Sequence, residues 1–221
     1  MAKMNIGIIG AGNLGTAIAG RLTRMGHAVM LSFSKDLGKL KTSAASLGAR
    51  VGTPAEAVEF GDVVVLATPW TATADALRQL GNVKTGKIVW DCTNALKPDM
   101  SGLAIGTTTS GGEEVAKLAP WAKVVKATPP FAELLHSPNT LINGARPGVF
   151  VCGDDRAARK VVAGLVADIG AEPTDAGPLS LARYTEPACM LMVQLAYVEG
   201  WGTRISLTVV RETPDSAPGA H

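Results

Sequence analysis

Three glycines, Gly10, Gly12 and Gly15, directly follow the apolar run at residues 5–9. Gly10 permits a tight turn, Gly12 has no side chain to obstruct a pyrophosphate, and Gly15 lets the next helix pack closely on the strand. The N-terminus of that helix offers free N–H groups and the positive end of its dipole to phosphates. The pattern of strand, glycine loop and helix predicts dinucleotide binding by Gly10, Ala11, Gly12, Asn13, Leu14 and Gly15.

The next apolar run ends in Ser32, Phe33, Ser34 and Lys35. A site specific for NAD usually has an acidic residue at this strand end, where it binds the ribose 2′-hydroxyl. Two hydroxyls and an ammonium group suit a 2′-phosphate better, and we expect Asp36 to belong to the following helix. NADP is therefore the expected cofactor. In the alternative interpretation, Lys35 is an ordinary solvated lysine.

Small polar residues and prolines follow three later apolar runs, at residues 68–70 (TPW), 91–94 (DCTN) and 127–130 (ATPP). The carboxyl ends of neighbouring parallel strands lie at one edge of a sheet, where α/β proteins bind ligands. Each segment alone is consistent with a simple turn. Together they predict a pocket for the nicotinamide and the substrate that includes Thr68, Pro69, Asn94, Thr128 and Pro129.

The sequence shows no acid/base pair and no clear candidate for an ionisable group beside the nicotinamide, so we predict no catalytic acid or base. His136 is the only histidine expected near the pocket, and a surface or core role suits it better than catalysis. The C-terminal helix offers no lysine that could act as a proton donor, because no lysine follows Lys160. Near its start this helix has only Arg183, Tyr184 and Glu186. Hydride exchange between two redox carriers depends more on orientation than on proton transfer, and the sequence favours that chemistry.

Four other acidic residues stand where helices are expected to begin. Asp154 and Asp155 precede one helical stretch, and Glu113 and Glu114 begin another. Acidic residues at these positions cap a helix or complement its dipole. We assign them this structural role rather than a catalytic one.

Short runs rich in Ile and Val alternate with stretches of helical period, which predicts an α/β fold with a Rossmann-type, doubly wound and mostly parallel sheet. We expect strands near residues 4–9, 28–32, 49–51, 62–67, 87–91, 122–126, 148–152 and, weakly, 171–173. We expect helices near residues 13–25, 36–47, 54–60, 71–80, 112–119 and 155–168.

Residues 101–112 are rich in Gly, Ser and Thr, which predicts a mobile loop between a strand and a helix. Such a loop either closes over a site or is a plain surface connection. A turn at residues 175–178 (DAGP) is expected to end the alternating section.

A Met-rich apolar helix is predicted from about residue 180 to residue 199, with Pro187 capping or kinking it. A helix that is apolar on nearly all sides is buried. We expect a dimer contact here, with burial in the core of the same chain as the alternative. The chain thus divides into an NADP-binding Rossmann domain (1–175) and a small C-terminal helical segment (176–221), whose residues 213–221 we expect to be a frayed tail.

The composition is that of a globular protein: 47% of the 221 residues are hydrophobic, 18% are charged, and the formal net charge is +2. No dense run of Lys and Arg suggests a nucleic-acid or membrane partner. The three cysteines and the histidines lie far apart, without the spacing of a disulfide framework or a metal site. With no signal peptide apparent, we expect a soluble, reduced, cytoplasmic protein that acts on a small molecule.

Four segments resemble those of coenzyme F420-dependent NADP oxidoreductases and their bacterial relatives. They are residues 10–15 (GAGNLG), 67–70 (ATPW), 151–155 (VCGDD) and 175–179 (DAGPL). Their order and spacing are similar to that family over about residues 5–200. The resemblance implies a compact Rossmann domain with a small C-terminal helical piece, usually as a dimer.

The resemblance also implies where ligands lie. The pyrophosphate would contact Ala11, Gly12, Asn13 and Leu14; the 2′-phosphate would contact Phe33, Ser34 and Lys35; and the nicotinamide would lie near Thr68, Pro69 and Asn94. Coenzyme F420, a deazaflavin, would stack over the nicotinamide, walled by residues 128–130 and the C-terminal helix.

The chain departs from the family at Ser34, where family members tend to carry an arginine, and this predicts weaker affinity for the 2′-phosphate. Some relatives, among them the cytoplasmic domains of membrane metalloreductases, use an electron acceptor other than F420. Two alternatives to F420 chemistry remain: an NADPH-dependent reductase of a small imine or carbonyl compound, and a non-catalytic NADP(H) sensor whose switch is the loop at residues 101–112.

Overall fold

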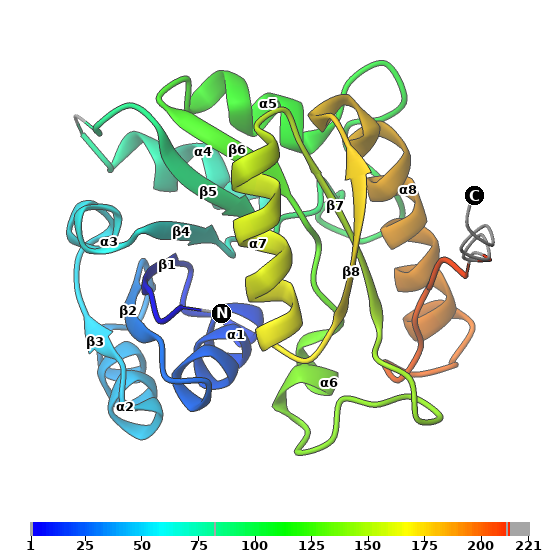
Figure 1. The fold of residues 1–221 in the computed structure, drawn as a ribbon, viewed down its shortest axis with the longest axis horizontal. Coiled ribbons are helices and arrows are strands. Elements are labelled where there is room, and N and C mark those ends of the chain that lie inside the picture. Colours follow the sequence, from blue (N-terminus) through cyan, green and yellow to red (C-terminus); the bar gives the residue numbers. More distant parts are fainter. Residues whose placement is uncertain (1, 82, 211, 213–221) are drawn as a thin grey trace, which may run out of the picture.

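An eight-stranded sheet in the order β3-β2-β1-β4-β5-β6-β7-β8 runs through the molecule (Figure 1). The computed structural model describes residues 2–81, 83–210 and 212. The pairs from β3 to β6 are parallel, β7 pairs antiparallel with β6, and β8 pairs parallel with β7. The mostly parallel, doubly wound α/β fold predicted from the sequence is confirmed, and its first six strands have the Rossmann order.

The strands are β1 Asn5–Ile9, β2 Ala28–Ser32, β3 Arg50–Val51, β4 Val63–Leu66, β5 Lys87–Asp91, β6 Ala122–Lys126, β7 Gly148–Gly153 and β8 Glu172–Gly177. The helices are α1 Asn13–Arg24, α2 Leu37–Leu47, α3 Pro54–Phe60, α4 Trp70–Arg78, α5 Gly111–Leu118, α6 Ala132–His136, α7 Arg156–Asp168 and α8 Ala182–Val193.

Helices cover both faces of the sheet. Apolar residues of α1, α2, α6 and α7 pack with one face in a single buried cluster, whereas those of α3, α4 and α5 pack with the other. β4 has four buried residues in a row (VVVL) because it lies in the middle of the sheet and is covered on both sides. Parallel pairing of β1, β2, β4, β5 and β6 sets the carboxyl ends of these strands side by side.

Two differences from the predicted elements have local causes. The helix α6 was not predicted, because its five residues are too few to show a helical period. The predicted turn at residues 175–178 is wrong, since Asp175–Gly177 completes β8 instead. Pro173 and Gly177 disfavour a central strand, but β8 is the last strand of the sheet, where they are tolerated.

The irregular segment after β5 is shorter than predicted. Ser110 is the N-cap of α5, and its side chain accepts a hydrogen bond from the N–H of Glu113. Gly111 and Gly112 therefore belong to the helix, not to the loop predicted at residues 101–112. Between β5 and α5, the only β pairing among the described residues is an isolated antiparallel bridge from Leu96 to Leu103.

The predicted C-terminal helix has three parts: a 3₁₀ turn at Leu179–Leu181, α8, and a π-helical turn at Gln194–Val198. Pro187 lies inside α8, which continues past it. Apolar side chains at the end of this helical region, such as Val198 (67% exposed) and Trp201 (65% exposed), face solvent. Burial within the same chain therefore does not account for its apolar surface.

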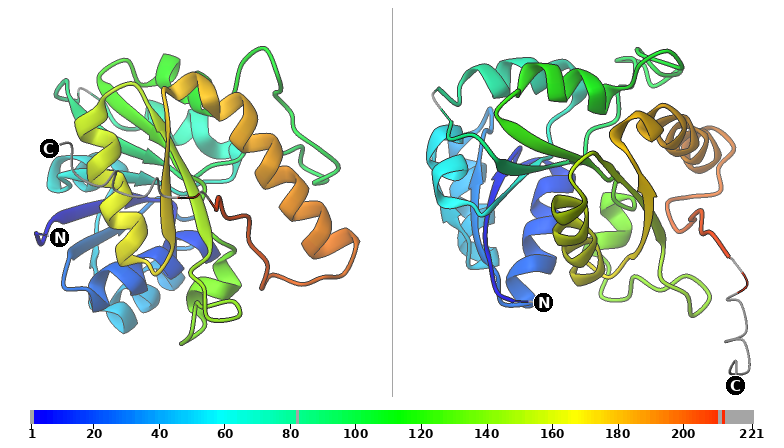
Figure 2. Two further views of the ribbon diagram at one scale, coloured as in Figure 1. Left: turned by 45° about the vertical axis from the view of Figure 1, so that its right-hand side comes forward. Right: turned by 45° about the horizontal axis from the view of Figure 1, so that its top comes forward.

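Beyond α8 the chain turns back toward the sheet (Figure 2). The backbone N–H of Gly148, at the start of β7, donates a hydrogen bond to Ser206 Oγ over 2.7 Å. A Cβ atom at Gly148 would overlap the carbonyl oxygen of Leu207, so the two backbones approach closely. The tail predicted at residues 213–221 lies outside the described residues.

Among residues 2–81, 83–210 and 212, no helix has the length and apolar character needed to cross a membrane. The same residues contain no group of three or more His, Cys, Asp or Glu side chains placed to hold a metal ion.

Candidate functional site

The glycine loop between β1 and α1 has the geometry predicted for its three glycines. Gly10 has φ = +112°, and a Cβ atom there would overlap the carbonyl oxygen of Ala67. A Cβ atom at Gly15 would overlap the carbonyl oxygen of Gly10. At Gly12, by contrast, nothing lies within 4 Å of an added Cβ atom. Gly10 and Gly15 thus shape the turn, and Gly12 leaves space open at its surface.

The N-terminus of α1 is suited to an anion. Its N-cap, Gly12, makes no side-chain hydrogen bond to the first turn, and that turn contains no acidic residue. The free N–H groups and the dipole of the helix therefore face the space above Gly12 without an internal partner. The loop residues fit the diphosphate of a dinucleotide.

The glycine loop is joined to the end of β2. The N–H of Gly10 donates to Ser32 O over 3.0 Å, and the N–H of Ala11 donates to Phe33 O over 3.3 Å. Phe33 adopts a left-handed conformation with φ = +57°, which turns the chain away from the strand. Ser34 and Lys35 follow on the surface, beside the loop that would hold the diphosphate.

Asp36 does not contribute a free carboxylate to this strand end. It is the N-cap of α2, where its side chain accepts a hydrogen bond from the N–H of Lys39 over 3.0 Å. Ser34 Oγ donates to the carbonyl oxygen of Asp36 over 3.1 Å. The described geometry thus agrees with the prediction that Asp36 belongs to the following helix.

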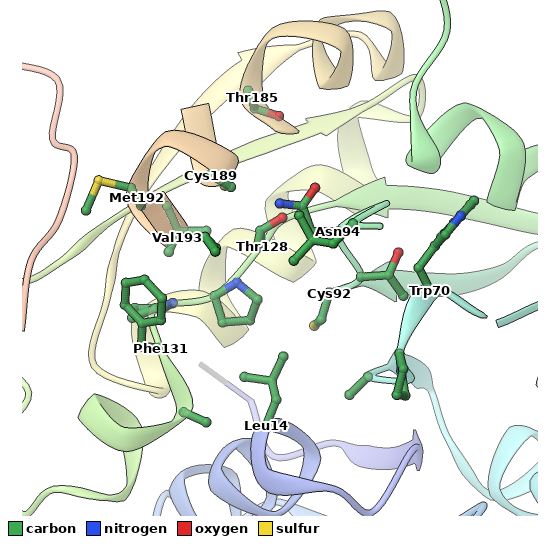
Figure 3. Close-up of a pocket in the computed structure, with 18 of the residues that line it drawn as sticks. Leu14, Trp70, Cys92, Asn94, Thr128, Phe131, Thr185, Cys189, Met192 and Val193 are labelled. Atoms are coloured by element: carbon green, nitrogen blue, oxygen red, sulfur yellow. The ribbon is translucent and has the colours of Figure 1, made fainter. Parts of the chain in front are cut away.

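The ends of β4, β5 and β6 meet in a cavity of about 600 Å³. Thr68, Asn94 and Thr128 follow these three strands, and all three line it together with Pro69 and Pro129. The predicted meeting of the three strand ends is confirmed. Figure 3 shows Asn94 and Thr128 near the middle of the cavity, with Leu14 of α1 on one side and α8 opposite.

The wall opposite α1 comes from α8 and the segment that follows it. Thr185, Cys189 and Met192 of α8 line the cavity (Figure 3), as does the C-terminal segment at residues 205–207. Apart from the predicted binding residues, the other lining residues are mainly apolar and include Trp70, Leu96, Pro98, Met100, Phe131, Phe150, Ala188 and Val193. No Asp, Glu, Lys, Arg or His lines the cavity in the described part of the chain.

The structure divides the predicted binding residues into two sets. Those that line the cavity are Gly12, Asn13, Leu14, Thr68, Pro69, Asn94, Thr128 and Pro129. Those outside its lining are Gly10, Ala11, Gly15, Phe33, Ser34 and Lys35, which form the glycine loop and the adjoining end of β2. The second set would lie along the adenosine and diphosphate half of a dinucleotide whose other half enters the cavity.

Asn94 has the one buried side-chain oxygen without a hydrogen-bond partner in the described residues. A buried polar atom without a partner costs about 1–3 kcal/mol, so such an atom calls for a ligand group that satisfies it. Asn94 also lines the cavity, so a ligand group that donates an N–H to its Oδ1 would satisfy this atom. The carboxamide of a nicotinamide carries such an N–H.

A buried ionic cluster, which was not predicted from the sequence, lies beneath the cavity. Lys126 Nζ lies 3.1 Å from Asp91 Oδ2 and 3.1 Å from Glu186 Oε1, and all three side chains are at most 1% exposed. Burial alone would lower the pKa of Lys126, but the two carboxylates outweigh it and raise that pKa above its usual value. Lys126 is therefore a buried ammonium ion. Glu186 points into this cluster and not into the cavity.

Other ionisable residues considered in the sequence have structural roles. Asp155 caps α7 by accepting from the N–H of Ala158, as predicted, whereas Asp154 accepts from the N–H of Leu179 rather than capping the helix. Glu113 and Glu114 occupy the first turn of α5, as predicted. His136 Nε2 lies 3.0 Å from Asn13 Oδ1, on the outside of the glycine loop.

The three cysteines are free thiols. Burial raises the pKa of Cys92 and Cys189 above the usual value and that of Cys152 to about 11. Because the thiolate is the reactive form, we expect the folded protein to react slowly with a disulfide reagent such as DTNB at pH 8. Absorbance should show three thiols per chain only after unfolding in guanidinium chloride. Rapid labelling of the folded protein would contradict the burial of these thiols.

Residues 5–95 match a family described as NADP oxidoreductase, coenzyme F420-dependent. Over 160 residues the chain is 31% identical to the F420-dependent NADP reductase of Methanocaldococcus jannaschii, with 69% of this chain and 70% of that protein covered. Over 184 residues it is 30% identical to the metalloreductase STEAP3 of Rattus norvegicus. That match covers 82% of this chain but 35% of the metalloreductase, so the chain spans about a third of its length.

A solved structure from Arthrobacter sp. FB24, provisionally described as an F420-dependent NADP-reductase, is similar over nearly the whole chain. The two superpose with a TM-score of 0.83 at 27% identity, and the match covers 94% of this chain and 100% of the other. The similarity thus includes β7, β8 and α8, which lie beyond the residues matched by the family.

Proposed function

The chain belongs to the family of coenzyme F420-dependent NADP oxidoreductases, and from that premise we propose that it transfers hydride between NADP(H) and F420 or a similar flavin-like acceptor. The observation that carries this proposal is a single cavity that joins the glycine loop to a mainly apolar wall and has no Asp, Glu, Lys, Arg or His in its lining among the described residues. A planar redox ring can stack there against a nicotinamide.

We assign the diphosphate of NADP(H) to Ala11, Gly12, Asn13 and Leu14. The open space at Gly12 and the uncapped N-terminus of α1 support this assignment. The nicotinamide then lies against Thr68, Pro69 and Asn94, where Asn94 Oδ1 accepts an N–H from its carboxamide. When bound, NADP(H) supplies or takes up the hydride, and these residues fix the plane and the rotation of its reacting ring.

The acceptor occupies the part of the cavity bounded by Thr128, Pro129 and α8. Reduction of an imine or carbonyl compound calls for a proton donor beside the reacting atom. Among the described residues the cavity is lined by no Asp, Glu, Lys, Arg or His, and burial raises the pKa of its two thiols, Cys92 and Cys189. Transfer between two redox rings depends mainly on their distance and alignment. The lining therefore favours a flavin-like acceptor over an imine or carbonyl compound.

We place the 2′-phosphate of NADP(H) at Phe33, Ser34 and Lys35. Replacing Lys35 with aspartate should weaken NADPH binding by about 10- to 100-fold, because an attractive charged contact is lost and a repulsive one is introduced. The affinity for NADH, which lacks this phosphate, should change little. Fluorescence titration with both nucleotides measures the two dissociation constants.

The matched control is Lys41→Asp, which makes the same charge change at an exposed position on α2. It should leave the preference for NADPH intact. Equal losses of NADPH affinity in the two variants would reflect net charge alone and would remove the assignment of Lys35.

We further propose a cytoplasmic homodimer in which the NADP-binding domain (1–175) is followed by a C-terminal segment (176–221) that forms the dimer contact. Exposed apolar side chains at Tyr184, Leu191 and Val198 support a contact at this end of the molecule. The three free thiols agree with a reducing compartment. Sedimentation at micromolar concentration tests the dimer, since a monomer there would contradict it.

The proposed activity is tested by following NADPH oxidation optically with F420 as the acceptor and with FMN in a parallel reaction. Turnover with F420 would support the proposal. Tight NADPH binding without turnover on either acceptor would overturn it in favour of another small substrate or of an NADP(H) sensor.

A further inference from the structure

Helix α8, which forms one wall of the cavity, has a single narrow row of buried residues. This row consists of Ala182, Glu186 and Met190, with Glu186 at its centre. Thr185 and Cys189, on the adjacent face, line the cavity. Glu186 is therefore the central buried polar contact among those that set the position of this wall, which also include the Arg183–Glu113 ion pair.

Both carboxylate oxygens of Glu186 are bound. Oε2 accepts from the N–H of Gly111 over 2.8 Å, and Oε1 accepts from the N–H of Gly112 over 2.9 Å. Oε1 also lies 3.1 Å from Lys126 Nζ. A single buried side chain thus connects α8 to the N-terminus of α5 and to β6. Charge-assisted bonds of this kind are directional, whereas apolar side chains alone would allow α8 to slide.

Lys126 extends the same network to the other wall of the cavity. Its Nζ donates to the carbonyl oxygen of Thr93 and to Asp91 Oδ2, the latter over 3.1 Å. Asp91 Oδ1 in turn accepts from the N–H of Thr93 over 2.9 Å. Asn94, which lines the cavity and has a buried oxygen without a partner, is the next residue in the chain. Lys126 is thus bonded to both the turn that presents Asn94 and the helix that forms the opposite wall.

We propose that Lys126 and Glu186 are positioning residues, which fix the separation between the Thr93–Asn94 turn and α8 and thereby align the two reacting rings. This inference rests on the proposed function, because it assumes one ring beside Asn94 and another beside α8. Neither residue touches a ligand; each acts through the residues it holds. An error of about 1 Å in such an alignment can lower a rate by about 100-fold.

Glu186→Gln in the full chain is the first variant, since glutamine has nearly the same shape but lacks the charge. The matched control is Glu113→Gln, which removes an ion pair between the same two helices, from Glu113 of α5 to Arg183 of α8, outside the cavity lining. Three quantities are measured for each: NADPH affinity and stoichiometry, the single-turnover rate of NADPH oxidation by F420, and amide hydrogen exchange in peptides covering residues 92–96.

In Glu186→Gln we expect the single-turnover rate per NADPH site to fall by about 10- to 100-fold, while the dissociation constant of NADPH stays within about threefold. The deuterium isotope effect with NADPH labelled at the transferred C4 position should persist or increase. Exchange at residues 92–96 should accelerate, although the substitution lies on another element. Glu113→Gln should change neither the rate nor this exchange. An unchanged rate per NADPH site, or a parallel loss of rate and NADPH affinity, would overturn the proposal.

Gly111→Ala is a second variant that leaves every charge in place. A Cβ atom there would lie 3.2 Å from both oxygens of Glu186 and 3.1 Å from Ala95 Cβ, so it should press Glu186 away and slow the reaction as well. The exchange measurement separates the two proposals. If the unmodified protein oxidises NADPH with neither F420 nor FMN, the proposed function fails. If exchange at residues 92–96 is the same in Glu186→Gln as in the unmodified protein, the positioning role fails, whatever the turnover.

Discussion

Replacing Lys126 with methionine is expected to lower the free energy of unfolding by about 3–5 kcal/mol, because removal of one partner leaves buried charges uncompensated. Asp91 and Glu186 are 0% and 1% exposed at their side chains, so water cannot replace the lost ammonium group. Methionine fills nearly the same volume, which keeps the effect electrostatic rather than steric. Equilibrium unfolding in urea, followed by circular dichroism, measures the change.

The control for this variant is Lys123→Met on the same strand. Lys123 pairs with Asp155 over 2.6 Å, but its side chain is 45% exposed, so the loss should be no more than about 1 kcal/mol. The raised pKa of Lys126 means that its contribution is fully present below the ordinary lysine pKa of 10.5 and is lost as the pH rises through the higher folded value. The difference between the unmodified protein and Lys126→Met should therefore be constant through neutral pH. A loss as small as that of the control would show that the buried cluster contributes little.

Replacing Gly12 with valine is expected to weaken NADPH and NADH about 100-fold or more, equivalent to about 3 kcal/mol of steric overlap with the bound diphosphate. The folded protein itself has room for this side chain, since nothing lies within 4 Å of an added Cβ atom. The backbone at Gly12 (φ = −80°, ψ = −165°) is extended and is open to valine. Calorimetric titration should show the loss of binding, with the melting temperature of the free protein unchanged.

Gly106→Val serves as the comparison, because Gly106 also has free space around an added Cβ atom but lies in the exposed segment before α5. Nucleotide affinity should be normal in that variant. Retention of NADPH binding by Gly12→Val would remove the diphosphate from the glycine loop and with it the placement of the nicotinamide.

The glycine loop and the three strand ends could be predicted because their causes are local or follow from the topology. Gly10 has a positive φ of +112°, which glycine adopts most readily, and Gly15 packs on the carbonyl oxygen of Gly10 in the same loop. The meeting of Thr68, Asn94 and Thr128 follows once β4, β5 and β6 are neighbours and parallel. Such features depend on the order of the strands and not on the packing of individual side chains.

The buried cluster and the contribution of residues 205–207 to the cavity could not be predicted in this way, whereas the resemblance to the family had already implied a wall from the C-terminal helix. Lys126 and Asp91 are 35 residues apart, and Gly112 and Glu186 are 74 apart, so no periodicity connects them. A lysine that ends an apolar strand has the same sequence pattern whether its ammonium group reaches solvent or a buried carboxylate. The segment at residues 205–207 has no strand or helix pattern, and its place in the cavity depends on the backbone contact with Gly148.

This return of the C-terminal segment has a consequence for the order in which the site is built during synthesis on the ribosome. The glycine loop is among the first parts of the chain to emerge, and domains generally fold from the N-terminus as the chain grows. Residues 205–207 emerge some 190 residues later and are nevertheless part of the same cavity. A nascent chain can therefore form its glycine loop well before the C-terminal wall of the cavity exists, and a chain that stops short of residue 205 would leave that side of the cavity open to solvent.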